Sequence, residues 1–297
     1  MSNYKTYTDK EVEELYTLYK EGTSMKKLAK QIGRKSEESI RTLFKRRGYD
    51  TSIQRRYPID ETFFNKIDNE LKAYYLGFIA ADGCIQKSNS LDIAIQARDG
   101  YILEPLKDAI QPKKPLQIIY GKGNRQDQLK LSIRSVKLCS QLTSLGFPPN
   151  KSIAGMSYPN LSQDLHRHFI RGFFDGDGTI TGCLSKTISR AGVGLINDGL
   201  SRKVKMVSTS KKFLEEINAN LISMGLSKRS VIQDKSRQRK TPLYRLCYSS
   251  ISDISKLETL FYTDANYYLH RKRKKFQLYL LTPSEYREVI SSVPANA

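Results

Sequence analysis

The stretches YLGFIAADG at residues 75–83 and IRGFFDGDG at residues 170–178 are two copies of one nine-residue pattern. The copies match in register, which places Asp82 and Asp177 at the same position of each copy, 95 residues apart. A pattern that returns after a fixed separation indicates an internal repeat, and a repeat decides how the remaining sequence is interpreted. We therefore expect two related halves.

Each copy is followed by the same order of expected secondary structure. Alternating apolar residues predict strands, and apolar residues at spacings of three and four predict helices. In the first half we expect strands at 84–86, 91–97, 116–120 and 128–134, one helix capped by Asp99 and another from Ser135 to Leu145. In the second half we expect strands at 179–183, 203–207, 230–233 and 243–248, and helices from Ser210 and around Ile251. With the motif as a helix, each half is α-β-β-α-β-β-α.

Composition points to a polyanionic partner. The chain has 297 residues, of which 39% are hydrophobic, so it can bury a core. Lysine and arginine number 50 against 30 acidic residues, and the net charge of +20 favours nucleic acid as the partner. A membrane surface is the competing interpretation, but no apolar run approaches the ~20 residues that span a bilayer, and the N-terminus is no signal peptide. We therefore expect a soluble, cytoplasmic protein whose partner is nucleic acid.

Cysteine and histidine exclude other chemistries. The four cysteines are widely separated without a CxxC pair, which argues against a zinc site or a disulfide framework. Three histidines leave little material for a histidine-rich metal site or a Ser-His-Asp triad. Any metal ion must therefore be held by carboxylates.

Residues 1–50 predict three short helices, of which the first is capped by Thr8, the second starts near Ser24 and the third is capped by Ser36. A tight turn at Gly33 separates the second helix from the third. A short helix, a glycine turn and a second helix are typical of a helix-turn-helix DNA-binding module. A plain three-helix bundle with a solvated basic face is the alternative.

Basic residues follow this turn. The third helix carries Arg41, Lys45 and Arg46, which we expect to contact DNA. Residues 51–68 predict a linker, in which Arg55 and Arg56 could follow a phosphate backbone.

The paired nonapeptides resemble the motif of the LAGLIDADG homing endonucleases of the single-chain, two-motif type. Two motifs in register, each followed by the same element order, make the resemblance specific over residues 57 to about 280. It implies an α+β fold, in which two pseudo-symmetric αββαββα halves pack through their motif helices after a small all-α module. The expected parts are the module 1–50, the linker 51–68, a first half 69–155, a second half with a closing helix 156–282, and a C-terminal tail 283–297.

Small residues in the motif suit two helices in close contact. Glycine and alanine let the backbones nearly touch, at Gly77, Ala80 and Ala81 in one copy and at Gly172 and Gly176 in the other. The larger apolar residues should face the two cores, namely Phe78, Ile79, Phe173 and Phe174.

The Asp-Gly ends of the motifs should bring Asp82 and Asp177 together at the helix C-termini. Two carboxylates beside the negative ends of two helix dipoles are unfavourable unless divalent cations neutralise them. The resemblance implies that these acids bind Mg²⁺, which Mn²⁺ can replace, beside Gly83 and Gly178, and that the protein cuts both DNA strands.

The Asp-Gly sequence has two other interpretations. An EF-hand loop that begins at Asp175 fails because its sixth position is Ile180 rather than glycine and its twelfth is Lys186 rather than glutamate. A plain Asp-Gly turn without chemistry does not explain why both halves share the whole nonapeptide.

The resemblance also implies a basic residue near each metal site. It points to Lys151 in the segment that leaves the first half, and to Lys272, with Arg271 as its rival, at the start of the closing helix. A lysine there could polarise the scissile phosphate or orient water. A surface lysine that touches backbone phosphate is the alternative at each position. The first motif departs from the family pattern at Ala80, where the second has Asp175, but this position does not bear the metal.

Strand alternation separates a core face from a face that could read DNA. Leu91, Ile93 and Ile95 are expected inward, and Asp92 and Ser132 outward. Arginine and lysine can pair with guanine edges and glutamine with adenine, although each could also be an ordinary solvated position. The expected DNA contacts are Gln96, Arg98, Lys130 and Arg134 in the first half, and Lys203, Lys205, Arg229, Gln233, Lys235, Arg237, Arg239 and Arg245 in the second.

The loops differ between the halves. Residues 185–202 form a longer excursion than the matching 87–90, and residues 235–240 form a dense basic hairpin tip. An asymmetric protein of this kind should prefer a target that is not a perfect palindrome.

The expected function is Mg²⁺-dependent hydrolysis of one phosphodiester bond on each strand of a long double-stranded DNA site, by a monomeric homing endonuclease of a mobile genetic element. The alternatives are a non-catalytic DNA-binding regulator with this fold and an RNA-binding intron maturase. Two acids beside a polyanion argue against the regulator, and no aromatic-rich RNA motif supports the maturase.

Overall fold

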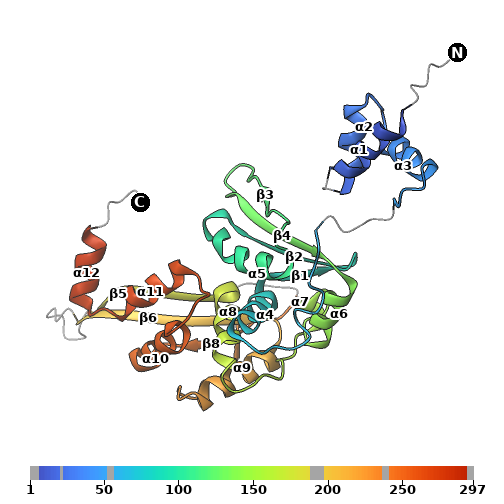
Figure 1. The fold of residues 1–297 in the computed structure, drawn as a ribbon. Helices are drawn as coiled ribbons and strands as arrows, with labels where there is room; N and C mark the ends of the chain where they lie inside the picture. Colours follow the sequence, from blue (N-terminus) through green and yellow to red (C-terminus); the bar gives the residue numbers. More distant parts are fainter. Residues whose placement is uncertain (1–6, 21–22, 52–56, 188–196, 236–240, 293–297) are drawn as a thin grey trace. The chain divides into compact units, whose positions relative to one another are not determined.

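The computed structural model describes residues 7–20, 23–51, 57–187, 197–235 and 241–292. The chain divides into two units. The first contains Met1–Asp60 with Gln111–Pro115, and the second contains Glu61–Ile110 with Leu116–Ala297. The first unit is helical and the second mixes helices with sheets (Figure 1). None of the described helices is both long and apolar enough to cross a membrane.

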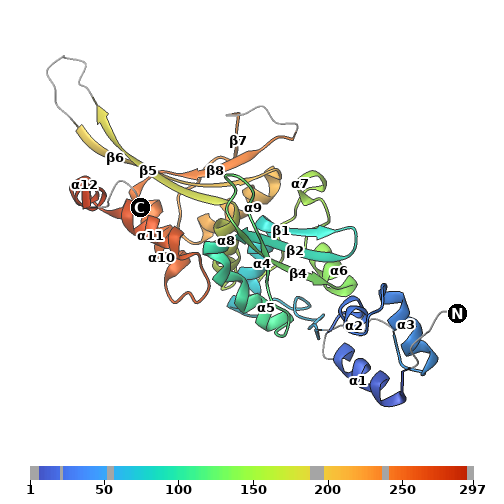
Figure 2. The same cartoon turned by 90° about the horizontal axis from the view of Figure 1, so that it is seen from above.

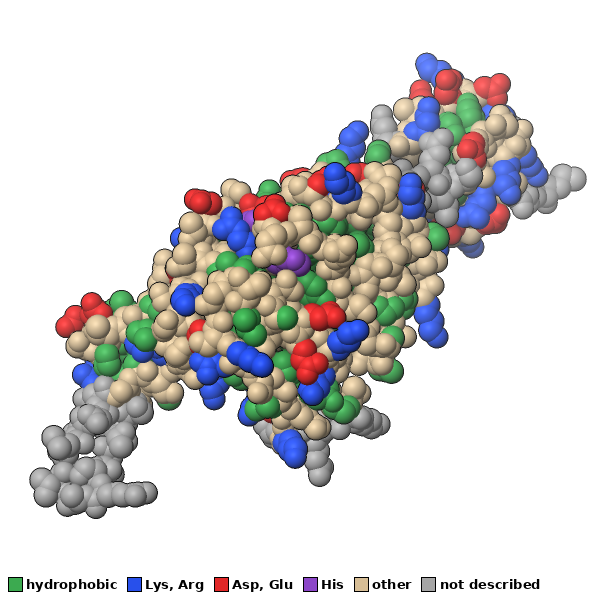
Figure 3. Space-filling model, turned by 90° about the horizontal axis from the view of Figure 1, so that it is seen from below, with side chains coloured by type: hydrophobic (Ala, Val, Ile, Leu, Met, Phe, Trp, Pro, Cys, Tyr) green, Lys and Arg blue, Asp and Glu red, His purple; other side chains and the backbone are tan. Residues whose placement is uncertain are grey.

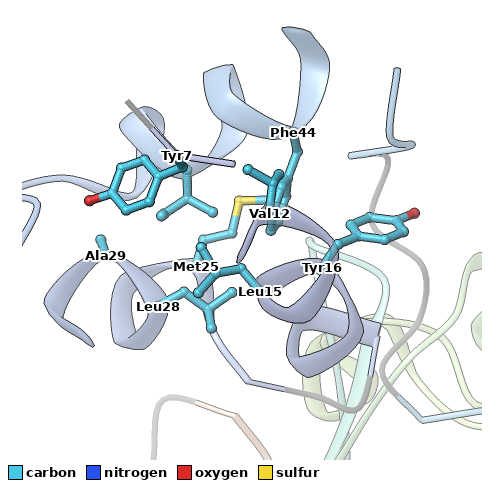
Figure 4. Packing of buried hydrophobic residues seen from close by; sticks show 9 residues of the cluster. Tyr7, Val12, Leu15, Tyr16, Met25, Leu28, Ala29 and Phe44 are labelled. Atoms are coloured by element: carbon cyan, nitrogen blue, oxygen red, sulfur yellow. The ribbon is translucent and has the colours of Figure 1, made fainter. Parts of the chain in front are cut away.

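Helices make up the described secondary structure of the first unit: α1 (Asp9–Lys20), α2 (Met25–Gln31) and α3 (Glu37–Arg46). Their apolar residues form one small core, in which Val12, Leu28, Ile40 and Phe44 are fully buried. Figure 4 shows side chains from all three helices pointing into this cluster. The core is what the spacing of apolar residues predicts.

The caps of these helices largely follow the sequence. The hydroxyl of Thr8 accepts from the backbone N–H of Glu11, and the Glu11 carboxylate accepts from the N–H of Thr8, a capping box. The Ser24 hydroxyl accepts from the N–H of Lys27 and so caps α2. Ser36 precedes α3 as expected, but within the described residues its side chain makes no capping bond.

The first half of the second unit has the predicted element order. Its elements are α4 (Glu70–Asp82), β1 (Gly83–Gln86), β2 (Ser90–Gln96), the 3-10 helix η1 (Ala97–Leu103), α5 (Glu104–Ile110), β3 (Gln117–Ile119), β4 (Gln128–Arg134) and α6 (Val136–Ser144). The short helix α7 (Lys151–Ala154) follows. Every neighbouring pair in the sheet is antiparallel, in the order β1-β2-β4-β3.

The second half repeats this arrangement. Its elements are α8 (His166–Asp177), β5 (Gly178–Thr187), β6 (Asn197–Ser208), α9 (Lys211–Ser223), β7 (Ile232–Gln233), β8 (Tyr244–Tyr248), α10 (Ile251–Tyr262), α11 (His270–Leu280) and α12 (Pro283–Ser292). The strand order β5-β6-β8-β7 is that of the first sheet with the same antiparallel pairing. The predicted α+β fold of two pseudo-symmetric halves is confirmed.

The core faces of the strands also agree with the alternation. Leu91, Ile93 and Ile95 of β2 are buried, as are Val204 and Met206 of β6. Helices cover the inner face of each sheet, and the motif helices α4 and α8 lie side by side between the halves (Figure 1). The alternate residues of the same strands, such as Asp92 and Gln96 of β2, lie on the opposite, outer face of the sheet.

Two local expectations were wrong. Asp99 does not cap a helix, because it lies inside η1 with its side chain buried, and its carboxylate pairs with Arg271, 2.8 Å away and far along the chain. Much of the excursion 185–202 is strand rather than loop. The ladder between β5 and β6 continues to the pair Thr187 and Asn197, so backbone hydrogen bonds outweigh the polar, glycine-containing sequence there.

Candidate active site

The contact between α4 and α8 depends on two glycines. A Cβ added at Gly77 would lie 1.9 Å from the carbonyl oxygen of Phe169, and one at Gly172 would lie 1.9 Å from that of Tyr74. The two glycines occupy equivalent positions of the repeat, and each faces the backbone of the other helix in the same way. Only glycine permits this approach, so the motif sequence fixes how closely the helix ends meet.

A buried polar network holds the same pair of helices. Arg171 of α8 is fully buried, and its guanidinium donates to the Glu70 carboxylate at 2.6 Å, to the Phe261 carbonyl at 2.9 Å and to the Tyr267 carbonyl at 2.8 Å. Glu70 also accepts from the backbone and side chain of Asn266. The network joins the start of α4, the middle of α8 and the segment after α10. Sequence analysis missed it, although an arginine inside an apolar motif was a possible signal.

Asp82 and Asp177 are the last residues of α4 and α8, as predicted. In each half the glycine that follows closes the helix, with the N–H of Gly83 donating to Ile79 and that of Gly178 donating to Phe174. A Cβ placed at Gly176 would lie 3.2 Å from a carboxylate oxygen of Asp82. The Asp82 carboxylate therefore lies against α8 one residue before Asp177, and the two acids share one site.

Two carboxylates and two lysines act in opposite directions on the pKa values at this site. Both side chains retain solvent-accessible surface, Asp82 more than Asp177, so a ligand can reach both carboxylates although protein atoms surround them. Burial among the surrounding protein atoms raises the pKa of Asp82, and burial together with the charge of Asp82 raises the pKa of Asp177 to about 6. The charges of Lys151 and Lys272 lower both values in part. The structure thus brings all four predicted catalytic residues into one electrostatic cluster.

Lys151 and Lys272 occupy equivalent places. The Nζ of Lys151 donates to the carbonyl of Gly83, and the Nζ of Lys272 donates to the carbonyl of Gly178. Arg271, the rival of Lys272, instead forms its ion pair with Asp99. Lys272 is the residue at the start of α11 that matches Lys151.

The two lysines differ in burial. Lys272 has only 4% of its surface exposed, and its Nζ also donates to the carbonyls of Phe174 at 2.5 Å and Asp175 at 2.6 Å. Burial lowers the pKa of Lys272 to about 8 and also lowers the pKa of Lys151, which has fewer contacts. The second half therefore holds its lysine more firmly.

Asp175 accounts for part of this difference. Its buried carboxylate accepts from the Tyr74 hydroxyl and from the N–H of Leu269, both at 2.8 Å, which ties the segment before α11 to the motif helix. Ala80 stands at the equivalent position of α4. Asp175 belongs to a helix and residue 178 begins a strand, so the rejected EF-hand loop is also inconsistent with the fold.

The pair of acids fits a hard divalent cation. Within the described ranges no group of three or more His, Cys, Asp or Glu side chains could hold a metal ion alone. Mg²⁺ commonly binds one or two carboxylates and takes its other ligands from water and substrate phosphates. Asp82 and Asp177 match that donor set, and the carbonyls of Gly83 and Gly178 adjoin it while accepting from the lysines.

The predicted DNA contacts of the first half lie mainly on the outer face of its sheet. Gln96 of β2 and Arg134 of β4 are exposed, and Lys130 of β4 forms an ion pair with Asp92 at 2.8 Å. Arg98 is exposed but lies in η1, because β2 ends at Gln96.

In the second half two of the predicted contacts do not lie on the outer face of a strand. The ladder pairs Gln233 with Tyr244 and Ile232 with Arg245, so Gln233 faces away from the side that carries Arg245. Arg229 precedes β7, and its guanidinium donates to the buried carboxylate of Asp253 at 2.7 Å. The remaining predictions stand on the outer face or beside it, at Lys203, Lys205, Lys235 and Arg245.

The other basic predictions lie elsewhere. On α3, Lys45 and Arg46 are exposed and Arg41 lies 3.6 Å from Glu38. Arg55, Arg56, Arg237 and Arg239 lie outside the described residues. On the face drawn in Figure 3, lysine and arginine side chains of the second unit are dispersed among neutral and acidic ones rather than gathered in one patch.

Comparison with known proteins supports the fold. No protein-family model matches the sequence, and no curated protein matches it significantly. The meganuclease I-SmaMI, bound to uncleaveable DNA with a TTGT central four, is similar with a TM-score of 0.50 and 15% identity, over 78% of this chain and 99% of that one.

Further solved structures share lower similarity. The LAGLIDADG meganuclease I-AabMI, bound to uncleaved DNA, has a TM-score of 0.47 at 17% identity over 75% of this chain and 92% of that one. The N-terminal LAGLIDADG domain of WhiA has a TM-score of 0.41 at 18% identity over 68% of this chain and 89% of that one. The likeness to I-SmaMI shows that the chain has the fold of the single-chain LAGLIDADG meganucleases.

Proposed function

We propose that the chain is a site-specific endonuclease that hydrolyses one phosphodiester bond in each strand of a long, pseudo-palindromic DNA target. The observation that carries this proposal is the pair Asp82 and Asp177, brought together at adjacent helix ends with their pKa values raised. In a protein of net charge +20 that only bound DNA, two mutually repelling acids next to a polyanion would weaken the binding. Both acids are on one chain, so the enzyme acts as a monomer.

The four residues have distinct roles in this proposal. Asp82 and Asp177 supply oxygen ligands for Mg²⁺, which Mn²⁺ can replace. When bound, Mg²⁺ supplies a Lewis acid that offsets charge at the scissile phosphate and activates water. Hydrolysis then adds water to phosphorus and breaks one P–O ester bond in each strand. Lys151 and Lys272 place a positive charge beside each acid, where it offsets the charge of the attacked phosphate.

The outer faces of the two sheets are the proposed DNA surface. They carry Gln96, Lys130, Arg134, Lys203, Lys205 and Arg245, whose donors suit base edges and phosphates. I-SmaMI, which shares the fold, is bound to DNA in its solved structure. In the same proposal α3 of the first unit adds contacts through Arg41, Lys45 and Arg46.

Cleavage of a randomised double-stranded DNA library tests the proposal. The wild type, Asp82→Asn and Asp177→Asn are incubated with the library in Mg²⁺, in Mn²⁺ and without divalent ions, and binding is measured in parallel. Asp108→Asn serves as the matched control, because Asp108 is an exposed acid on α5 that pairs with Lys107.

Specific cutting by the wild type and the control, lost in both site variants while their DNA binding persists, is the expected result. Sequence-specific binding without cutting by the wild type would replace the enzyme with the regulator. RNA binding that survives both substitutions, without DNA cleavage, would favour the maturase.

A further inference from the structure

An acidic side chain stands on the outer face of the first sheet, where the proposed function places DNA. One carboxylate oxygen of Asp92 accepts from the hydroxyls of Ser132 at 2.6 Å and Ser90 at 3.1 Å, and the other lies 2.8 Å from the Nζ of Lys130. Burial opposes ionisation, but the hydrogen bonds from Lys130, Ser132 and Ser90 lower the pKa of Asp92. Asp92 is thus a charged anchor with little capacity left to accept from a base.

A second acid has the same relation to basic residues in the other half. Asp234, which follows β7, has 5% of its side chain exposed and lies 3.9 Å from Lys205 and 3.8 Å from Arg245. The two cations come from β6 and β8, and Lys205 and Arg245 each keep 35% of their side-chain surface exposed. Both cations thus keep exposed side-chain surface while they share one buried carboxylate as their ion-pair partner.

The strand register places these pairs in matching rows beside the motif acids. Asp92 pairs with Cys84, two residues after Asp82, and Lys205 pairs with Thr179, two residues after Asp177. At this matching position β2 therefore carries an acid, Asp92, and β6 carries a base, Lys205. In both halves an acid–base pair occupies the part of the sheet nearest the proposed catalytic site.

Unrestrained lysine and arginine have high side-chain entropy and readily swing toward phosphate, which carries no sequence information. A carboxylate that holds the cation in place keeps its donors where only a base edge of suitable geometry can meet them. The same negative charge repels phosphate and weakens binding to every sequence alike.

We propose that Asp92 and Asp234 are specificity-determining positioning residues, which hold Lys130, Lys205 and Arg245 on the outer sheet faces so that these cations read base edges rather than phosphates. This inference rests on the proposed DNA binding, but it does not require cleavage.

Binding without divalent ions separates the two proposals. A preferred duplex is first selected by the wild type from a randomised library in EDTA. Its affinity, that of every single-base-pair variant and that of an unrelated duplex are then measured at several salt concentrations. The proteins compared are the wild type, Asp92→Asn, Asp234→Asn and the control Asp108→Asn, and thermal unfolding verifies that each is folded.

The expected result for Asp92→Asn is tighter binding to the unrelated duplex, by about threefold to tenfold, with a salt dependence steeper by about one phosphate contact. Discrimination should fall by about tenfold at one or two base pairs on the side of the first half. Asp234→Asn should have the same effect at different base pairs, on the side of the second half.

Other results would overturn the inference. Unchanged discrimination in both folded variants, or an equal loss of affinity for all duplexes, would show a merely structural role for the acids. Lys130→Met provides a second measurement, because it should lose discrimination at the base pairs that Asp92→Asn affects while binding all DNA more weakly. A wild type that binds with sequence preference but never cuts would refute the endonuclease and leave this inference standing. A wild type without sequence preference would refute the inference itself.

Discussion

The Nζ of Lys272 lies 2.7 Å from the carbonyl oxygen of Gly178, and Lys151 donates to Gly83 in the same way on the other side of the repeat. The Lys272 ammonium is also shielded from solvent, because it is buried and donates to two further carbonyls at the end of α8. A cation at this place offsets the negative end of the helix dipole. One side chain therefore both closes the motif helix and adds positive charge beside Asp177.

Lys272→Met should lower the free energy of unfolding by about 2–4 kcal/mol, because three buried carbonyls lose a charged donor while the apolar stem is retained. Lys151→Met should cost about 1 kcal/mol or less, since it loses a single bond at a less buried position. Chemical denaturation of both variants measures the difference. Equal losses would contradict the unequal holding of the two lysines.

The fold could be predicted from the sequence because each half of the repeat shows local patterns of glycine and apolar residues. Gly77 and Gly172 recur in register, and the alternation of Leu91, Ile93 and Ile95 identifies the core face without knowledge of the partner strand. The register between neighbouring strands could not be predicted from such local patterns. Gln233 was assigned to the wrong face because its short strand offers no alternation to follow.

Only part of the site could be predicted, because the rest depends on contacts between residues that are distant in the sequence. Asp82 and Asp177 follow from the motif, but the choice between Arg271 and Lys272 depends on Asp99, which lies more than 170 residues away and pairs with Arg271. The burial of Arg171 likewise depends on partners from three separate segments. Contacts of this kind are properties of the tertiary structure and leave no local pattern in the sequence.

Asp177→Asn should make the free protein more stable near neutral pH. The pKa of Asp177 is raised to about 6 in the folded state, above about 3.9 for an unfolded chain, so the folded state binds more protons between these values. Stability of the wild type is therefore lost as the pH rises from about 4 through 6. The variant lacks this loss, so it should exceed the wild type by about 1–3 kcal/mol at pH 7.5 and match it below pH ~4.

Chemical denaturation across pH 3.5–8 checks this expectation, with Asp108→Asn as an exposed control that should follow the wild type at every pH. A variant that is less stable than the wild type at pH 7.5 would show that the carboxylate is not under repulsion. Added Mg²⁺ should stabilise the wild type more than Asp177→Asn, because the variant lacks one of the two proposed ligands.

Gly77→Ala should be severely destabilising. The new methyl group would lie 1.9 Å from the Phe169 carbonyl oxygen, so α4 and α8 must move apart along their whole contact. We expect a loss of about 4 kcal/mol or more, or failure to fold. Gly155→Ala is the matched control, because no atom lies within 4 Å of its Cβ and the change is opposed by its backbone conformation (φ 88°, ψ 167°), at about 1–3 kcal/mol. Thermal unfolding of both variants gives the comparison, and similar losses would contradict the tight helix contact.

Removal of the basic residues of α3 should weaken DNA binding more than removal of the same charge from α2. The triple substitution of Arg41, Lys45 and Arg46 by alanine is compared with that of the exposed Lys26, Lys27 and Lys30. If α3 enters the DNA groove, the first variant should lose affinity and about two to three units of salt dependence, and the second should lose little. The DNA affinity of both variants, measured at several salt concentrations, tests this expectation. Equal losses of affinity in the two variants would indicate a plain three-helix bundle with a solvated basic face.

The unequal hairpins predict an unequal target. Both hairpins begin beside a motif acid, but β5 has ten residues where β1 has four, and β5 and β6 extend beyond the rest of their sheet (Figure 2). Six more residues at about 3.3 Å each span about 20 Å, which corresponds to about six base pairs of DNA. Truncating the target one base pair at a time should therefore reduce affinity up to about six base pairs farther out on the side of the second half.

A shortened protein, in which an Asn-Gly turn connects Leu184 to Leu200, keeps the pairing of the inner part of the hairpin. It should abolish this difference while the central base pairs are still recognised. Equal tolerance to truncation on both sides in the full-length protein would show that the long hairpin does not follow the DNA.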